Sequence, residues 1–325
     1  MNYQIKLLLL SFSISLVIAT IIIPILRKFK IGQIEREDGP QSHLKKKGTP
    51  TMGGIITLIT LIIMSIFVWI EYGEILPEIT KSYILLALVS IGFGIIGFID
   101  DFKKLILKDT IGLKPAYKMI GLLVISVTFV IFLLQFINIG TDIIIPFINK
   151  SINIPIYIYI PFVIFVMLGT TNAVNLTDGI DGLATSVTTI IIACLTVIGV
   201  INQCKEVVFL GSIICGANLA FLLFNMHPAK IFMGDTGSLF LGGVIAGMAI
   251  YLKDPLVLLI IALVPIAETL SVIIQVAYFK KTGKRVLKMA PLHHHFELSG
   301  WNENKIVTVF SILTLVLCVI GVYSI

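Results

Sequence analysis

Long stretches without a charged residue recur along the whole chain. Nine of them cover residues 7–26, 51–70, 82–99, 119–141, 151–177, 182–204, 207–229, 236–252 and 306–325. A tenth, 255–279, is interrupted only by Glu268. A helix needs about 20 residues to cross the apolar core of a bilayer. The pattern therefore predicts an all-α integral membrane protein with ten transmembrane helices, which we interpret as one polytopic domain over residues 1–325.

The composition supports this class. Hydrophobic residues make up 57% of the chain and charged residues 13%, whereas a soluble domain carries about a quarter charged residues. The first stretch is longer than the apolar region of a signal peptide and is followed by Arg27 and Lys28, so we expect it to be retained as a span. The four cysteines show no metal-ligand spacing, and we interpret them as small hydrophobic residues.

Lysine and arginine residues predict the orientation. If the chain crosses ten times, the segments 27–50, 100–118, 172–182, 225–237 and 280–305 share one side and hold 19 basic residues, against five on the other side. Because basic loops stay in the cytoplasm, this side is predicted to be cytoplasmic and both termini to lie outside. The outward loop 138–157 is rich in Ile around the turn residues 149–151 and predicts a small β-hairpin.

Five aspartates fall at the predicted cytoplasmic ends of these helices. Asp100 and Asp101 close the third stretch, Asp178 and Asp181 lie between the fifth and sixth, and Asp235 lies between the seventh and eighth. Helix ends that meet at one membrane surface bring their loops together. We therefore expect a single cytoplasmic cleft that contains all five carboxylates.

Each of these motifs alone allows two interpretations. The pair Asp100-Asp101 is either a solvated helix end paired with the next lysines, or a set of carboxylates that bind Mg²⁺ or accept a proton. The motifs NLTDGIDG and GDTGS are either turns and helix caps, or ligand-binding loops with glycines that let the backbone approach closely. Phe232 is either a packing residue or a platform on which a base stacks.

Two further features lie near the C-terminus. Glu268 is an ionisable residue within a span, which favours a function, and Pro265 is expected to bend that helix. Three consecutive histidines, residues 293–295, are consistent with a metal site, a solvated loop or a substrate contact. Side chains of consecutive helical residues diverge by about 100°, which argues against one metal ion bound by all three.

The loops KKKGTPTMGG, DDFKK, NAVNLTDGIDGLA, GDTGSL and PLHHHFELSGWNE occur in the order and spacing of one family. On these motifs the chain closely resembles the phospho-N-acetylmuramoyl-pentapeptide transferases, within the polyprenyl-phosphate N-acetylhexosamine-1-phosphate transferase superfamily. The resemblance covers essentially the full length. The first four motifs are partly shared with the wider superfamily, whereas the histidine segment is typical of the muramoyl-pentapeptide enzymes.

The resemblance implies a reaction, a cofactor and a location. The substrates would be UDP-N-acetylmuramoyl-pentapeptide and undecaprenyl phosphate, and the products lipid I and UMP, in the first membrane step of peptidoglycan synthesis. The enzyme would require Mg²⁺ and lie in the bacterial plasma membrane with its active site facing the cytoplasm. No nucleic acid partner is expected, and the sequence leaves the oligomeric state, a homodimer included, undecided.

Site residues are carried over from the same motifs. The resemblance makes Asp235 the magnesium-binding carboxylate, Asp100 the base and Asp101 its partner, with His294 beside them in the catalytic set. The implied binding residues, among them Phe232 stacking on uracil, are Lys46, Thr51, Lys104, Lys118, Asn172, Asn175, Leu176, Asp178, Gly179, Asp181, Asn225, Phe232, Gln275, His293 and His295.

Two other functions remain open on the sequence. One is a sister transferase that loads N-acetylglucosamine phosphate, and the other is a transporter or flippase. A transporter should carry its charges near the bilayer midplane, whereas here only Glu268 is expected to lie deep. The mechanism also stays open between direct attack by the lipid phosphate and a covalent phospho-enzyme.

Overall fold

The computed structural model describes residues 3–28, 46, 48–105, 112–148 and 150–325. Most of the predicted basic loop 27–50, part of the loop 100–118 and Asn149 of the predicted hairpin turn lie outside these residues. Ten helices of 18 residues or more run through the described part of the chain. They are α1 (Tyr3–Lys28), α3 (Gly54–Tyr72), α4 (Pro77–Leu105), α5 (Pro115–Gln135), α6 (Ile156–Thr177), α7 (Leu183–Ile201), α8 (Lys205–Asn225), α9 (Gly234–Tyr251), α11 (Leu263–Thr282) and α13 (Glu303–Tyr323).

Nine of these ten helices are long and apolar enough to cross a membrane. The exception is α9, which begins with the polar residues Gly-Asp-Thr-Gly-Ser. From Thr236 to Ile250 every residue of α9 is buried inside the bundle. The protein is therefore a multi-pass membrane protein. Helices suit this environment because all their backbone hydrogen bonds are made within one segment.

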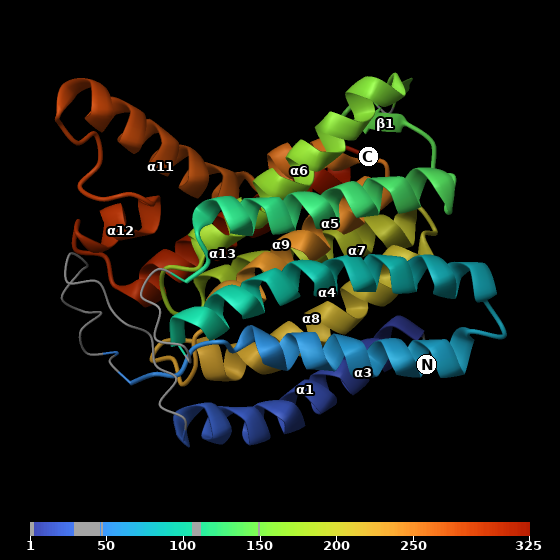
Figure 1. Cartoon of the computed structure of the whole chain (residues 1–325), viewed down its shortest axis with the longest axis horizontal. Helices are drawn as coiled ribbons and strands as arrows, with labels where there is room; N and C mark the ends of the chain where they lie inside the picture. The colour runs from blue at the N-terminus through green and yellow to red at the C-terminus, as the bar shows by residue number, and fades with distance from the viewer. Residues whose placement is uncertain (1–2, 29–45, 47, 106–111, 149) are drawn as a thin grey trace.

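The predicted β-hairpin is confirmed. Strands β1 (Asp142–Ile145) and β2 (Lys150–Asn153) pair antiparallel, with Ile143 opposite Ile152. Both chain ends lie at the same end of the bundle as this hairpin (Figure 1). At that end Ser324 O accepts the backbone N–H of Phe147 at 2.6 Å.

The predicted span 255–279 is divided, which corrects the expected bend at Pro265. A 3-10 turn, η1 (Pro255–Val257), and a short helix, α10 (Leu258–Ile261), precede α11. The helical conformation breaks at Ala262, and Pro265 lies in the first turn of α11. Its missing N–H is not needed there, because first-turn N–H groups have no partner within the helix. Helix α11 projects from the bundle and is followed by the short α12 (Leu292–Glu297) (Figure 1).

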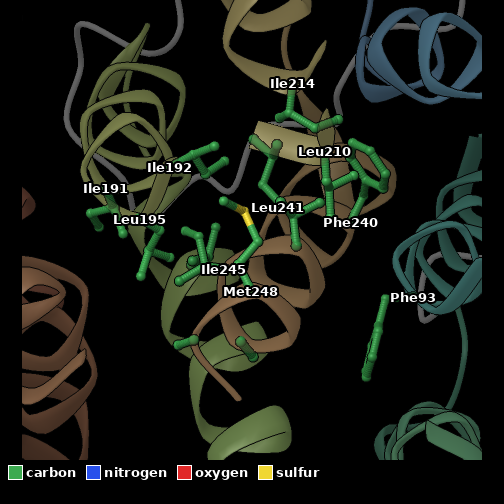
Figure 2. Packing of buried hydrophobic residues seen from close by; sticks show 14 of the residues in the cluster. Phe93, Ile191, Ile192, Leu195, Leu210, Ile214, Phe240, Leu241, Ile245 and Met248 are labelled. Carbon is green, nitrogen blue, oxygen red and sulfur yellow. The ribbon is translucent and has the colours of Figure 1, made fainter. Parts of the chain in front are cut away.

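Helix α9 forms the centre of the hydrophobic core. Figure 2 shows Leu241, Ile245 and Met248 of α9 packed among residues of α7 and α8, such as Leu195 and Leu210. Because α9 is enclosed on all sides, its N-terminus has a fixed position at the end of the bundle opposite the hairpin. That N-terminus carries Asp235.

Candidate active site

Helix α4 crosses α9 at a glycine one turn before the paired aspartates. A Cβ atom at Gly97 would overlap the backbone carbonyl of Asp235. Only glycine permits this approach of two backbones. The close crossing brings Asp100 and Asp101, at the end of α4, against the first turn of α9.

Asp101 acts as a cap for α9. Its carboxylate accepts the backbone N–H of Asp235 at 3.2 Å and that of Thr236 at 2.8 Å, together with the Thr236 hydroxyl at 2.6 Å. The first N–H groups of a helix have no partner within the helix, and a carboxylate at this end is stabilising. Asp101, 5% exposed, therefore holds the start of the helix that carries Asp235.

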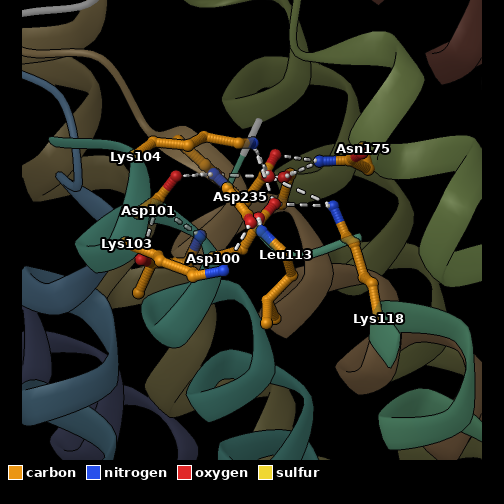
Figure 3. Close-up of polar contacts among 12 residues, drawn as sticks. Asp100, Asp101, Lys103, Lys104, Leu113, Lys118, Asn175 and Asp235 are labelled. Carbon is orange, nitrogen blue, oxygen red and sulfur yellow. Dashed lines mark hydrogen bonds and ion pairs between the residues drawn. The ribbon is translucent and has the colours of Figure 1, made fainter. Parts of the chain in front are cut away.

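Asp100 and Asp235 share two lysines (Figure 3). Lys104 Nζ lies 2.8 Å from Oδ2 of both carboxylates. Lys118 Nζ, from the first turn of α5, lies 3.4 Å from Oδ2 of Asp100 and 3.1 Å from Oδ2 of Asp235. The backbone N–H of Leu113 donates to Oδ1 of Asp100 at 2.7 Å. Two buried like charges are tolerated together only when cations lie beside them, and here the two ammonium groups supply that charge.

Helix α6 completes this cluster. Asn175 Nδ2 donates to Oδ1 of Asp235 at 2.7 Å and to the Ser238 hydroxyl at 2.8 Å. The carboxyl of Asp178, just after α6, accepts the backbone N–H of Gly234. Burial, together with the neighbouring Asp235 and Asp101 carboxylates, raises the pKa of Asp178 to about 8. The carboxyl of Asp178 is therefore mostly protonated at neutral pH.

A second polar cluster lies on the other side of the 178–181 loop. Lys46 Nζ binds Oδ1 of Asp181 at 2.7 Å and Oε2 of Glu303 at 2.6 Å. His227 Nδ1 lies 2.9 Å from Oδ2 of Asp181. Among the described residues, the one group of three potential metal ligands within 4.8 Å of one another is Asp181, His227 and Glu303. Lys46 contacts both acids there, and its single ammonium charge offsets one of the two carboxylate charges.

Phe232 lies beside this second cluster. Its backbone N–H donates to Pro50 O, and its carbonyl accepts the N–H of Gly53, both at 2.8 Å. The Lys46 ammonium lies 6.0 Å from the Phe232 ring centroid. The ring is half-buried and held by backbone contacts on both sides. It offers a fixed aromatic surface next to Lys46.

Several other predicted binding residues support the backbone of neighbouring loops. Asn225 Nδ2 donates to Ile231 O at 3.0 Å, next to Phe232. Gln275 Oε1 accepts the N–H groups of Val286 and Leu287, both at 3.0 Å. Thr51 is buried beside Gly234.

The three histidines occupy helix α12, and each has a different partner. His293 is 1% exposed and lies against Glu268. His294 Nδ1 lies 2.7 Å from Oε2 of Glu297. His295 Nδ1 accepts the backbone N–H of Lys288 at 3.2 Å. The three side chains therefore have different partners, although the rings of His293 and His294 lie in contact with their centroids 4.2 Å apart, and no metal-ligand group that includes these histidines is found within the described residues.

Comparisons with known proteins point to one family of enzymes. A family model described as glycosyl transferase family 4 matches residues 83–253. The chain is 52% identical over 314 residues to a phospho-N-acetylmuramoyl-pentapeptide-transferase of Clostridium botulinum, covering 97% of this chain and 94% of the relative. It is also 48% identical over 324 residues to the protein of that name from Clostridium novyi, covering 100% of this chain and 97% of the relative. It is 46% identical over 318 residues to the protein of that name from Acetivibrio thermocellus, covering 97% of this chain and 93% of the relative.

The chain belongs to the phospho-N-acetylmuramoyl-pentapeptide transferase family. The matched region of the glycosyl transferase model contains all five predicted aspartates. The similarity to these transferases continues through Lys46 and the histidine segment, which lie outside that region. This full-length similarity supports the transferase interpretation over the sister enzymes and the transporters.

The structure places most of the predicted site residues at one end of the bundle. Asn172 and Leu176 differ from the others in their contacts. Asn172 Nδ2 donates to Leu168 O of its own helix at 2.7 Å, and Leu176, which is half-buried, can contribute only apolar contacts. Glu303 and His227 were missed by sequence reasoning, although both bind Asp181 or its neighbours. Each lies at a helix end on the predicted cytoplasmic side, and this position is the sequence signal that could have identified them as site residues.

Proposed function

We propose that this chain transfers phospho-N-acetylmuramoyl-pentapeptide from UDP-N-acetylmuramoyl-pentapeptide to undecaprenyl phosphate, giving lipid I and UMP. Family membership supports the reaction. The observation that carries it is the pair of carboxylates, Asp100 and Asp235, that share Lys104 and Lys118. Both substrates are anions, and phosphoryl transfer depends mainly on positioning and charge stabilisation. A compact array of carboxylates and ammonium groups suits this chemistry.

We place this array at the cytoplasmic surface of the bacterial plasma membrane. In this proposal α9 is the tenth span, the whole chain is one transferase domain, and both termini lie outside. The distribution of 19 basic residues against five supports this orientation. A site at the membrane surface can receive a soluble nucleotide from one side and a lipid phosphate from the other.

The donor set fits Mg²⁺. Asp100 and Asp235 offer carboxylate oxygens, and the amide N–H of Asn175 holds Asp235 in place; oxygen ligands of this kind are those that Mg²⁺ prefers. We assign Asp235 as the principal ligand and Asp100 as its neighbour. When bound, the ion would neutralise phosphate charge and polarise a phosphoryl oxygen.

The remaining roles follow from the contacts. Asp100 is positioned by the Leu113 N–H to accept the residual proton of the lipid phosphate, which is already largely ionised near neutral pH and attacks directly. Lys104 and Lys118 bind phosphate oxygens. Asp101 keeps the N-terminus of α9, and so Asp235, in place.

The second cluster is assigned to the nucleotide. Phe232 stacks on the uracil base, with Lys46 and Asp181 beside it, and Gly179 lets the substrate-binding loop pack closely. His294, which pairs with Glu297, is assigned to the sugar phosphate. These assignments agree with the arrangement of the ring and ammonium group described above.

The decisive test is UMP release by the purified protein. We expect release only when UDP-N-acetylmuramoyl-pentapeptide, undecaprenyl phosphate and Mg²⁺ are all present. Equal activity with UDP-N-acetylglucosamine would favour a sister transferase. Substrate uptake into sealed vesicles without UMP release would favour a transporter.

A further inference from the structure

Glu268 has no part in the proposed reaction, yet it is the one acidic residue within the predicted span 255–279. Its side chain is 0% exposed in helix α11. A buried carboxylate in a membrane protein is costly unless it is paired, and it is then usually functional. The contacts of Glu268 therefore show which part of the structure the buried carboxylate stabilises.

The contacts of Glu268 lead to a single residue. Its Oε1 and Oε2 atoms lie 3.2 and 3.4 Å from the backbone N–H of His293, in the first turn of α12. Oε2 also lies 3.2 Å from Nδ1 of the His293 ring. Within the described chain, no other side chain forms a hydrogen bond or ion pair with this carboxylate. Glu268 thus accepts the backbone N–H of His293 and lies against its ring, whose two nitrogens are buried and make no hydrogen bond among the described residues.

The other edge of the His293 ring meets the substrate loop. A Cβ atom at Gly179 would overlap Nε2 of His293. Gly179 lies between Asp178, which contacts the N-terminus of α9, and Asp181, which binds Lys46. The ring therefore packs directly on the loop that joins the two polar clusters.

We propose that Glu268 is a positioning residue that acts through His293. Glu268 fixes the first turn of α12 and keeps the imidazole ring of His293 packed against Gly179. This packing contact in turn fixes the position of the 178–181 loop. In this arrangement the buried His293 ring packs on the 178–181 loop, and His294, in the same turn of α12, is the histidine assigned to the substrate. This role deepens the proposed function, because the loop it positions is the one assigned to the nucleotide.

The first experiment reports on α12 without using activity. The chain has two tryptophans, and Trp301 stacks on Phe296 of α12 with ring centroids 4.8 Å apart. Trp69 is exposed on α3, so Trp69→Phe leaves Trp301 as the sole reporter. In this background Glu268→Gln should raise the acrylamide quenching constant of Trp301. The matched control is Thr269→Val, the next residue on α11, which loses only a bond to Pro265 O and should leave quenching unchanged.

A steric double-mutant cycle tests the contact with the loop. Gly179→Ala should lower the thermal midpoint in detergent, because the added methyl group overlaps the His293 ring. In a His293→Ala background the ring is absent, so the same change should lower the midpoint much less. Residues in contact show such coupling, whereas distant residues behave additively.

Kinetics then separate a positioning role from general destabilisation. Glu268→Gln should lower kcat by about ten- to a hundredfold, the effect expected from a small misplacement of binding groups. It should raise KM for the UDP-substrate and leave KM for the lipid phosphate unchanged. Glu268→Asp, which keeps the carboxylate, should restore part of the lost kcat.

The outcomes are distinguishable. Unchanged Trp301 quenching in Glu268→Gln, or an equal effect of Gly179→Ala with and without His293, would overturn the positioning role. If Glu268→Gln does not fold, the Gly179 and His293 cycle still decides. If the wild-type protein releases no UMP, the proposed function fails, while the quenching and steric measurements still test Glu268.

Discussion

The adjacent residues Asp100 and Asp101 should respond differently to the same substitution. Asp101 accepts three hydrogen bonds at the N-terminus of α9, and an asparagine has only one oxygen with which to accept them. In the favourable rotamer the amide oxygen keeps the two bonds to Thr236, but the acceptor is no longer charged. The NH₂ group then faces the N–H of Asp235, and two donors cannot form a hydrogen bond. Hydrogen bonds to charged groups contribute about 1.5–3 kcal/mol each, so Asp101→Asn should cost about 2–4 kcal/mol of stability.

Asp100→Asn should cost less than about 1 kcal/mol. Its lysine partners are partly exposed, which weakens their pairing, and loss of its charge relieves repulsion with Asp235. It should nevertheless abolish most turnover, because the proposed proton acceptor is gone. The assays are thermal unfolding in detergent and UMP release for both variants.

A matched control separates capping from general disturbance. Thr236→Val removes only the hydroxyl that donates to Asp101, so its midpoint should fall by less than that of Asp101→Asn. Equal midpoints for Asp100→Asn and Asp101→Asn, or a less stable Asp100→Asn, would contradict the division of roles.

Four further changes test the site. Asp235→Asn should abolish turnover in a folded protein and weaken Mg²⁺ binding; near-normal activity at limiting Mg²⁺ would reject the metal role. Phe232→Ala should weaken uridine-nucleotide binding by about 1–3 kcal/mol, measured by calorimetry, and an unchanged affinity would return Phe232 to packing. His294→Ala should lower turnover about ten- to a hundredfold without loss of zinc; one zinc per chain, lost in the variant, would revive a metal site. In the folded protein the pKa of Asp178 is about 8, against an ordinary value of 3.8. The folded state therefore keeps a proton that the unfolded state releases. The free energy of unfolding of the wild-type protein should fall as the pH rises between these two values. Asp178→Asn should lack that slope in midpoints measured from pH 5 to 8, and equal slopes would show that Asp178 is ionised.

Absence of charge predicted the long helices well but their ends less well. The run 119–141 continues past the end of α5 at Gln135 up to the start of β1, and the run 151–177 begins inside β2, because these flanking residues are as uncharged as the helices beside them. Pro155 precedes α6 and marks its true beginning. In the run 255–279, the sequence signal nearest to the break at Ala262 is Pro265, which lies in the first turn of α11.

The aspartates could be brought together from the sequence because each follows a predicted span on the same side. The hydrogen-bond partners of these aspartates could not be predicted from the sequence. The bond from the Asp181 N–H to Glu303 joins residues 122 apart, and the cap from Asp101 to Thr236 joins residues 135 apart. Such contacts depend on how helices cross. The glycine that allows one of these crossings, Gly97, is one of 26 in the chain and cannot be singled out by pattern.

The arrangement of the lysines has a consequence for the proposed reaction. Lys104 and Lys118 are both bound to Asp100 and Asp235, so neither ammonium group is available to an arriving phosphate without a competing contact. A phosphate that takes the lysines leaves two buried carboxylates facing each other, which is unfavourable unless another cation replaces the ammonium groups. Binding of an anionic substrate and binding of a divalent cation should therefore strengthen each other, as linkage requires when each offsets the cost of the other. The same lysines keep the site balanced before substrate arrives, which explains how two carboxylates can lie together at the start of a buried helix.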